Sequence, residues 1–79
     1  MHLTITRVDE ILHDGDAYAV TLPGKSGEFS VMEGHMPLIT TLRPGKISVR
    51  LAAPQSDPNV FEIEGGVVEV TPAGAIVLL

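Results

Sequence analysis

The fold of this protein is decided by residues 27–38, Gly27-Glu28-Phe29-Ser30-Val31-Met32-Glu33-Gly34-His35-Met36-Pro37-Leu38. Apolar and polar residues alternate in the first half of this stretch, which predicts a half-buried strand. The alternation then breaks at Gly34, which can take a positive φ without steric cost, and Pro37 favours an extended backbone at the residue before it. We therefore expect a strand, a glycine-hinged loop and a second strand, with Glu28, Glu33 and His35 presented on a polar edge.

Short alternating runs and turn signals follow one another on both sides of this stretch. We expect strands over residues 3–8, 18–22, 38–42, 47–51, 61–64, 67–71 and 75–79, and a brief strand at residues 11–12. The predicted turns are Asp14-Gly15, Pro23-Gly24, Arg43-Pro44-Gly45 and Pro72-Ala73-Gly74, with an exposed hairpin loop over residues 53–59. Turn signals that recur about every 8–12 residues, without a helical repeat, predict an all-β sandwich or barrel.

The size and composition of the chain exclude several functions. With 79 residues, the chain is expected to form one domain, with one core but no deep internal active site. It has no cysteine, which excludes disulfides and thiolate metal sites. Ten acidic and five basic residues give a net charge of −5, which argues against nucleic acid as a partner. No signal peptide, lipid-binding basic cluster or membrane-spanning run is present, so no direct membrane insertion is expected.

His35 is the first candidate for chemistry. Together with Glu28 or Glu33 it could form a general acid–base pair, because imidazole titrates near neutral pH. The alternative is a loop histidine that is hydrogen-bonded to the backbone or lies in a contact surface. No nucleophile, second histidine or oxyanion-hole sequence accompanies it, which favours the alternative.

A second candidate is a cluster of acidic residues and a histidine early in the chain. Its members are Asp9, Glu10, His13, Asp14 and Asp16. Oxygen ligands of this kind can hold a hard cation. The glycine and the terminal glutamate are misplaced for a calcium loop, however, which favours solvated turn charges.

Two features near the end of the chain leave alternatives open. Gly65-Gly66 is typical of a bulge or tight turn, and no helix follows that could cradle a phosphate. The last strands are apolar on both faces, since Val67 lies opposite the face of Val68 and Val70. In the same way, Val77 and Leu79 lie opposite Ile76 and Leu78. Either these outer faces meet a partner, or two sheets fold over each other and cover both sides.

The sequence GEFSVMEGHMPLITTL over residues 27–42 resembles the strand–loop–strand of the epsilon subunit of F-type ATP synthases, called delta in mitochondria. Members of that family carry a Gly-His-x-Pro-Leu segment at this place. Further agreement lies at His2-Leu3, Asp14-Gly15, Pro44-Gly45 and residues 65–70. The resemblance spans nearly the whole chain in the right order.

This resemblance implies that residues 1–79 form a single epsilon-type domain, a flattened β-sandwich of about ten short, mostly antiparallel strands. It implies a non-catalytic rotor part without a cofactor, bound to the gamma subunit and resting on the c ring, that couples proton flow to ATP synthesis. By position in the family pattern, Glu28 falls at the c-ring contact. The gamma-contact residues would be Arg7, His35, Met36 and Thr40.

Two departures from the family pattern carry consequences. Glu33 stands where many members have proline, so this loop is expected to be less rigid. Nothing corresponds to the family's carboxy-terminal helical hairpin, so inhibition of ATP hydrolysis by that hairpin is not assigned. The absence of a transit peptide favours the bacterial cytoplasmic side of the inner or plasma membrane, with the protein peripheral through the complex. The alternative function is a free-standing β-sandwich that binds a small ligand or a metal.

Overall fold

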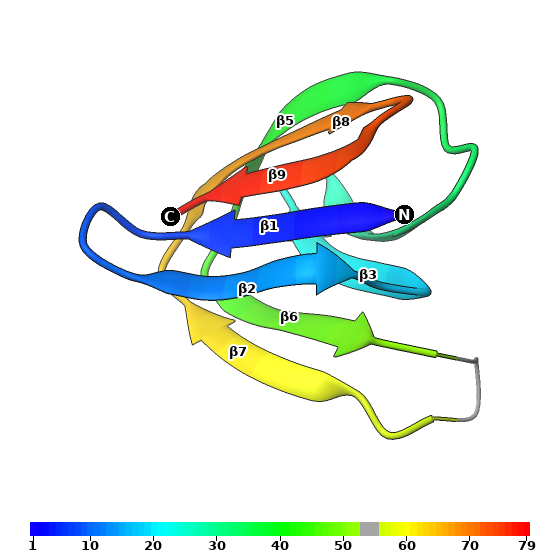
Figure 1. The fold of residues 1–79 in the computed structure, drawn as a ribbon. Helices are drawn as coiled ribbons and strands as arrows, with labels where there is room; N and C mark the ends of the chain where they lie inside the picture. The colour runs from blue at the N-terminus through cyan, green and yellow to red at the C-terminus, as the bar shows by residue number, and fades with distance from the viewer. Residues whose placement is uncertain (53–55) are drawn as a thin grey trace.

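The computed structural model describes residues 1–52 and 56–79, and within them the chain forms nine β-strands (Figure 1). The strands are β1 His2–Thr6, β2 Ile11–Asp16, β3 Ala19–Gly24, β4 Gly27–Met32, β5 Leu38–Leu42, β6 Gly45–Arg50, β7 Asn59–Ile63, β8 Gly66–Thr71 and β9 Gly74–Leu78. The all-β prediction is therefore confirmed. Of the expected loop over residues 53–59, residues 53–55 lie outside the described part, and β7 already begins at Asn59.

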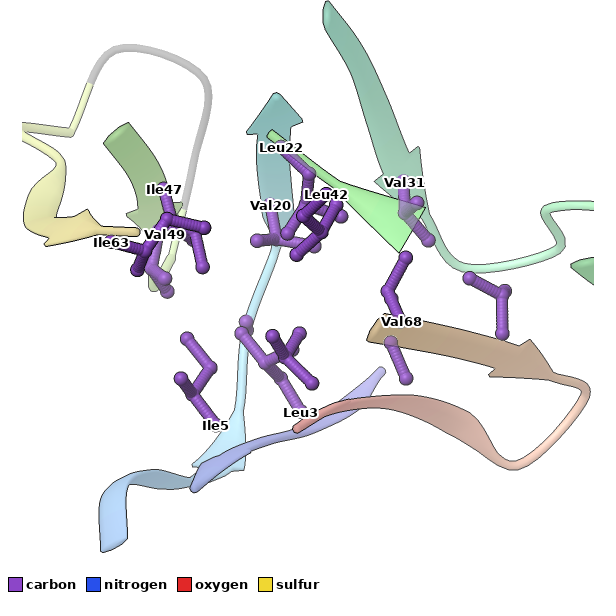
Figure 2. Packing of buried hydrophobic residues seen from close by; sticks show 14 residues of the cluster. Leu3, Ile5, Val20, Leu22, Val31, Leu42, Ile47, Val49, Ile63 and Val68 are labelled. Atoms are coloured by element: carbon purple, nitrogen blue, oxygen red, sulfur yellow. The ribbon is translucent and has the colours of Figure 1, made fainter. Parts of the chain in front are cut away.

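The strands form one curled sheet in the order β2-β1-β9-β8-β5-β3-β6-β7, with β4 paired to β3 outside this path. All pairs are antiparallel except β1 with β9. Because the sheet curls, β1 faces β3 and β6 across the interior. Figure 2 shows Leu3 and Ile5 of β1 pointing towards Val20 on β3 and towards Ile47 and Val49 on β6.

The interior between these layers is predominantly apolar, although the His13 ring from β2 reaches into it with a buried Nε2. Fourteen buried hydrophobic side chains form one cluster, and no polar or charged residue is buried as a whole among the described residues. Alternation places these residues inside: Ile47 and Val49 are fully buried on β6, while Lys46 is exposed. The alternation of Ile47, Val49 and Leu51 with polar residues predicts one buried face for this strand; Ile47 and Val49 confirm it, but Leu51 lies beyond the end of β6 and is 49% exposed, so the prediction is wrong there.

The predicted turn at Asp14-Gly15 is wrong. Both residues lie inside β2, where Asp14 is paired with Thr4 and Gly15 with Leu3. The Asp14 carboxylate accepts a hydrogen bond from His2 Nε2 at 2.8 Å, which ties the two strands together on the outer face. Pairing with β1 thus prevails over the local turn preference of the Asp-Gly pair, and the expected brief strand at residues 11–12 extends to six residues.

Asp14→Asn is expected to lower the free energy of unfolding by no more than about 1 kcal/mol, because the His2 and Asp14 side chains are 54% and 55% exposed and water screens the pair. Urea unfolding monitored by circular dichroism measures this change. Asp16→Asn is the matched control, since Asp16 is also exposed on β2. A loss above about 2 kcal/mol for Asp14→Asn alone would contradict the exposed-pair interpretation.

The predicted reversal at Arg43-Pro44-Gly45 is also wrong, because both β5 and β6 run antiparallel to β3. The chain bends there without turning back. Leu42 pairs with Gly66 and Gly45 pairs with Ile63, so β5–β6 and β7–β8 keep one register across the bend. The two halves form a single long ribbon that carries the chain from one layer to the other.

Gly65 and Gly66 lie at the corner of this ribbon, with φ of 144° and 153°. A Cβ on Gly66 would lie 2.5 Å from the backbone oxygen of Leu78 in β9. The glycine pair is therefore neither a hairpin turn nor a bulge, but a corner where another strand approaches closely.

Several predicted strand ends differ by one to three residues from the structure. β1 ends at Thr6, and the Arg7 N–H bonds the Glu10 carbonyl at 2.7 Å in the following turn. β3 continues through Pro23-Gly24, where a turn was expected, because the hairpin reverses at residues 25–26. The Pro72-Ala73 turn and the last strand are confirmed, with Gly74 belonging to β9.

Candidate functional site

The candidate site is built on β4, the loop at residues 33–37 and β5. Gly34 has a φ of 88°, so the positive φ expected from the sequence is confirmed. The His35 N–H donates to the Met32 carbonyl at 3.0 Å and closes the turn after β4. The strand–loop–strand prediction for residues 27–42 is thereby confirmed.

His35 is a backbone-bonded loop histidine. Its Nδ1 lies 2.7 Å from the Met36 carbonyl oxygen, which can only accept, so Nδ1 donates this bond. The half-buried ring lies beside the β8–β9 turn, in a small hollow of about 110 Å³. Met36, the next residue, is 78% exposed. This arrangement favours a contact surface over acid–base chemistry.

Glu28 and Thr40 line one groove, although they come from different strands. The groove has a volume of about 390 Å³ and lies between the β3–β4 hairpin, residues 24–29, and residues 38–40 of β5. Its apolar residues include Phe29 and Leu38, which are half-buried and pack against the core. Glu28 is exposed beside the hairpin turn, and Thr40 is half-buried on the inward side of β5, opposite Val68.

Arg7 lies apart from the other predicted site residues. It follows the carboxyl end of β1, in a polar hollow with Lys46 and Glu62. His35 lies against the β8–β9 turn, beside the amino end of β1, because Gly74 pairs with His2. Five residues of β1 separate these ends by about 16 Å. The structure therefore groups Glu28, His35, Met36 and Thr40 around β4–β5 and places Arg7 at the far end of β1.

The outer face of the sheet carries exposed apolar residues. Val67, Ile76 and Leu78 are 38%, 45% and 55% exposed, so the alternative in which two sheets cover both faces of the last strands is wrong for this chain. Cross-strand register extends the same face to Ile39, which is 70% exposed, and to Ile11, which is 65% exposed. Period two places Leu38 and Leu42 on one face of their strand, which could have identified Ile39 as an outer-face residue. The outward position of Ile11 could not be predicted in this way, because it depends on a register shift beside β1.

The acidic candidate does not assemble into a metal site. Within residues 1–52 and 56–79, no three His, Asp or Glu side chains come close enough together to hold a metal ion. On β2, Asp14 and Asp16 share the outer face, while His13 lies opposite Ile5 on the inner face. The part of the chain that the structure describes contains no helix that is long and apolar enough to cross a membrane.

The fold is a small all-β module built from one curled sheet, with Glu28, His35, Met36 and Thr40 grouped around β4–β5 and Arg7 at the far end of β1. The family model of the ATP synthase delta/epsilon chain β-sandwich domain matches residues 1–79, and the chain belongs to this family. An ATP synthase epsilon chain from Herminiimonas arsenicoxydans is 41% identical over 78 residues, which is 99% of this chain and 55% of that protein. The epsilon chain of Bordetella avium is 37% identical over 99% of this chain and 54% of its own length. The chain thus spans about half the length of these relatives.

Solved structures agree with the family assignment. A chain in the Euglena gracilis mitochondrial ATP synthase structure of OSCP, F1 and c-ring matches with a TM-score of 0.86 and 28% identity, over 99% of this chain and 49% of that one. A chain in the central stalk and c-ring structure of the Tetrahymena thermophila mitochondrial ATP synthase matches with a TM-score of 0.81. At 15% identity, this second match supports the fold alone.

Proposed function

We propose that this chain is a non-catalytic central-stalk subunit of a rotary F-type ATP synthase, where it links the gamma subunit to the c ring. The observation that carries the proposal is the 41% identity to an epsilon chain over 99% of this chain. The match to a chain of a synthase structure that contains F1 and the c-ring supports it. In this role the protein is peripheral to the membrane, on the cytoplasmic side in a bacterium, and is held there by its partners.

The proposed contacts use two surfaces around β4–β5: the exposed carboxylate of Glu28, and the surface formed by His35, Met36 and Thr40. The exposed carboxylate of Glu28 contacts polar loops of the ring by charge and hydrogen bonds, which gives a hydrated contact. His35, Met36 and Thr40 contact gamma, and the exposed Met36 supplies a flexible apolar side chain. Arg7 is the remaining gamma contact, so the gamma surface extends along the length of β1.

Thr40→Arg is expected to weaken binding to gamma at least about tenfold, because the larger charged side chain occupies the groove side of β5. His35→Ala removes the ring that bonds Met36 and is expected to weaken binding several-fold. Isothermal titration of the purified chain with recombinant gamma subunit from the same source measures both effects.

Thr41→Arg is the matched control for this titration. It places the same side chain one residue further along β5, on the exposed outer face. Thermal unfolding of each variant verifies that the fold is retained. If the wild-type chain fails to bind gamma, the proposed function is wrong; if Thr41→Arg weakens binding and Thr40→Arg does not, gamma binds the outer face instead.

A further inference from the structure

β4 is an edge strand, because it pairs with β3 and with no other described strand. β2 and β7 are the other terminal strands, and both have features that discourage further pairing. β2 contains a register shift and two aspartates. β7 begins after Pro58, and its end lies among the charged groups of Arg7, Lys46 and Glu62. β4 has an unbroken register of six pairs with β3 and one charged residue, Glu28.

The backbone groups of β4 that face outward can be assigned from its register. Pro23 lies opposite Glu28, and its carbonyl accepts the Arg43 N–H at 2.8 Å on the other side of β3. The Pro23–Glu28 pair is therefore not hydrogen-bonded, and Glu28 directs its own N–H and C=O towards the free edge. The same holds for Ser30 and Met32, two and four residues further along. Of these groups, the Met32 carbonyl already accepts the His35 N–H.

The free edge borders the apolar groove between β4 and β5. An added strand would lie about 4.8 Å from β4, and its alternate side chains would point to the same side as Phe29 and Val31. Phe29 is half-buried and lines the groove together with Leu38, and the groove volume of about 390 Å³ can take two or three apolar side chains. The groove thus selects an extended segment with apolar residues at alternate positions.

The charges near this edge indicate the sign of the charge that a bound segment carries. Glu28 lies near one end of β4 and Glu33 follows the other end; both are exposed, β4 itself has no cation, and the exposed Lys25 of the adjoining hairpin turn is the one cation among the groove-lining residues. The chain as a whole has a net charge of −5, which disfavours pairing between two copies of itself. A basic segment complements this edge, whereas a second β4 would add two glutamates and no positive charge.

We propose that the free edge of β4 binds an extended segment of a partner protein as an additional strand. Alternate apolar side chains of this segment occupy the groove beside Phe29 and Leu38, and a lysine or arginine lies next to Glu28. The assignment adds the backbone edge of β4 to the surfaces named in the proposed function, and it uses Glu28 and the groove beside Thr40 that those contacts also use.

The test begins with a displayed library of random ten-residue peptides, selected on the purified full chain. The enriched peptides are expected to show apolar residues with period two and at least one lysine or arginine. On binding of an enriched peptide, amide hydrogen exchange measured by NMR is expected to slow at least about tenfold at Glu28 and Ser30. Slower exchange confined to other strands, or enrichment without the period-two pattern, would overturn the proposal.

Ser30→Pro removes the edge N–H at the centre of β4 and is expected to reduce peptide affinity at least about tenfold. Ser30→Ala is its matched control, because it keeps that N–H and removes only the side-chain bond to Thr21, which measures 2.8 Å. If Ser30→Pro does not fold, N-methylation of alternate peptide amides in the ligand replaces it. N-methylation of the peptide amides that face β4 should abolish binding. N-methylation of the intervening amides, which face away from β4, should not.

Equal tolerance of both methylated sets would overturn the proposal, because strand addition uses only one set of peptide N–H groups. A concentration-dependent dimer of the wild-type chain in sedimentation at micromolar concentration, lost in Ser30→Pro, would overturn it in favour of pairing between two copies.

Glu28→Lys is expected to reverse the charge preference of the selected peptides, and an unchanged preference for lysine or arginine would contradict the assigned place of the basic residue. Binding to gamma is measured separately, so these results do not depend on the outcome for the rotor function.

Discussion

Gly74→Ala is expected to lower the free energy of unfolding by about 3 kcal/mol or more, the largest effect of any glycine replacement in this chain. Gly74 has a φ of 146°, which side-chain-bearing residues rarely adopt. A Cβ at this position would also overlap the backbone carbonyl of His2. Relief would require β1 and β9 to separate where they form the parallel pair, so the sheet itself must give way.

Urea unfolding followed by circular dichroism measures this loss, with Gly15→Ala as the control. Gly15 pairs with Leu3 in β2 and does not have a positive φ, and a Cβ added to it would meet no atom within 4 Å. Its replacement is expected to change stability by no more than about 1 kcal/mol in either direction. Equal midpoints for the two variants would show that β1 and β9 do not approach each other as closely as the structure shows.

Leu22→Ala is expected to cost about 2–5 kcal/mol, because it removes a fully buried side chain from the space between the layers. Figure 2 shows Leu22 beside Leu42, above the Leu3 side chain of β1. A domain of this size has a total stability near the lower end of about 5–15 kcal/mol. The variant is therefore expected to be partly unfolded at 37 °C.

Leu78→Ala removes the same atoms from a residue that is 55% exposed on the outer face of β9. Its cost is expected to stay below about 1 kcal/mol in the isolated chain, since most of that side chain already contacts water. Thermal unfolding of both variants and the wild type gives the comparison. A loss for Leu78→Ala as large as that for Leu22→Ala would mean that the outer face is covered, for example by self-association.

The alternation of apolar and polar residues was sufficient to predict the buried face of a strand wherever its other face is exposed to solvent. Ile47 and Val49 are buried and Lys46 is exposed, as the alternation predicts. Period two identifies such faces because the side chains of a strand alternate, whatever its partners are. The loop hinge at Gly34 was predictable for the same local reason, since it depends on a φ that glycine takes freely.

Local turn signals were less reliable than the alternation. Asp14-Gly15 pairs with β1 instead of turning, and residues 43–45 bend the chain without reversing it. In both places, hydrogen bonds to a distant strand prevail over a turn preference that amounts to only a small free energy per residue. In the candidate site, too, the local structure was predictable and the long-range arrangement was not. Residues 27–42 form the expected strand, loop and strand, but the separation of Arg7 from His35 depends on the register of β1 with β9.

The amino-acid order alone determined that the chain is all-β, which face of β6 is buried, and where the β4–β5 loop hinges, because each of these depends on neighbours within a few residues. Tertiary structure alone decided that β5 and β6 continue as one bent ribbon, that Glu28 and Thr40 share a groove, and that one edge of β4 stays unpaired. These features depend on pairing between residues that are far apart in the sequence, and the free energy of such pairing is not encoded in any single short window.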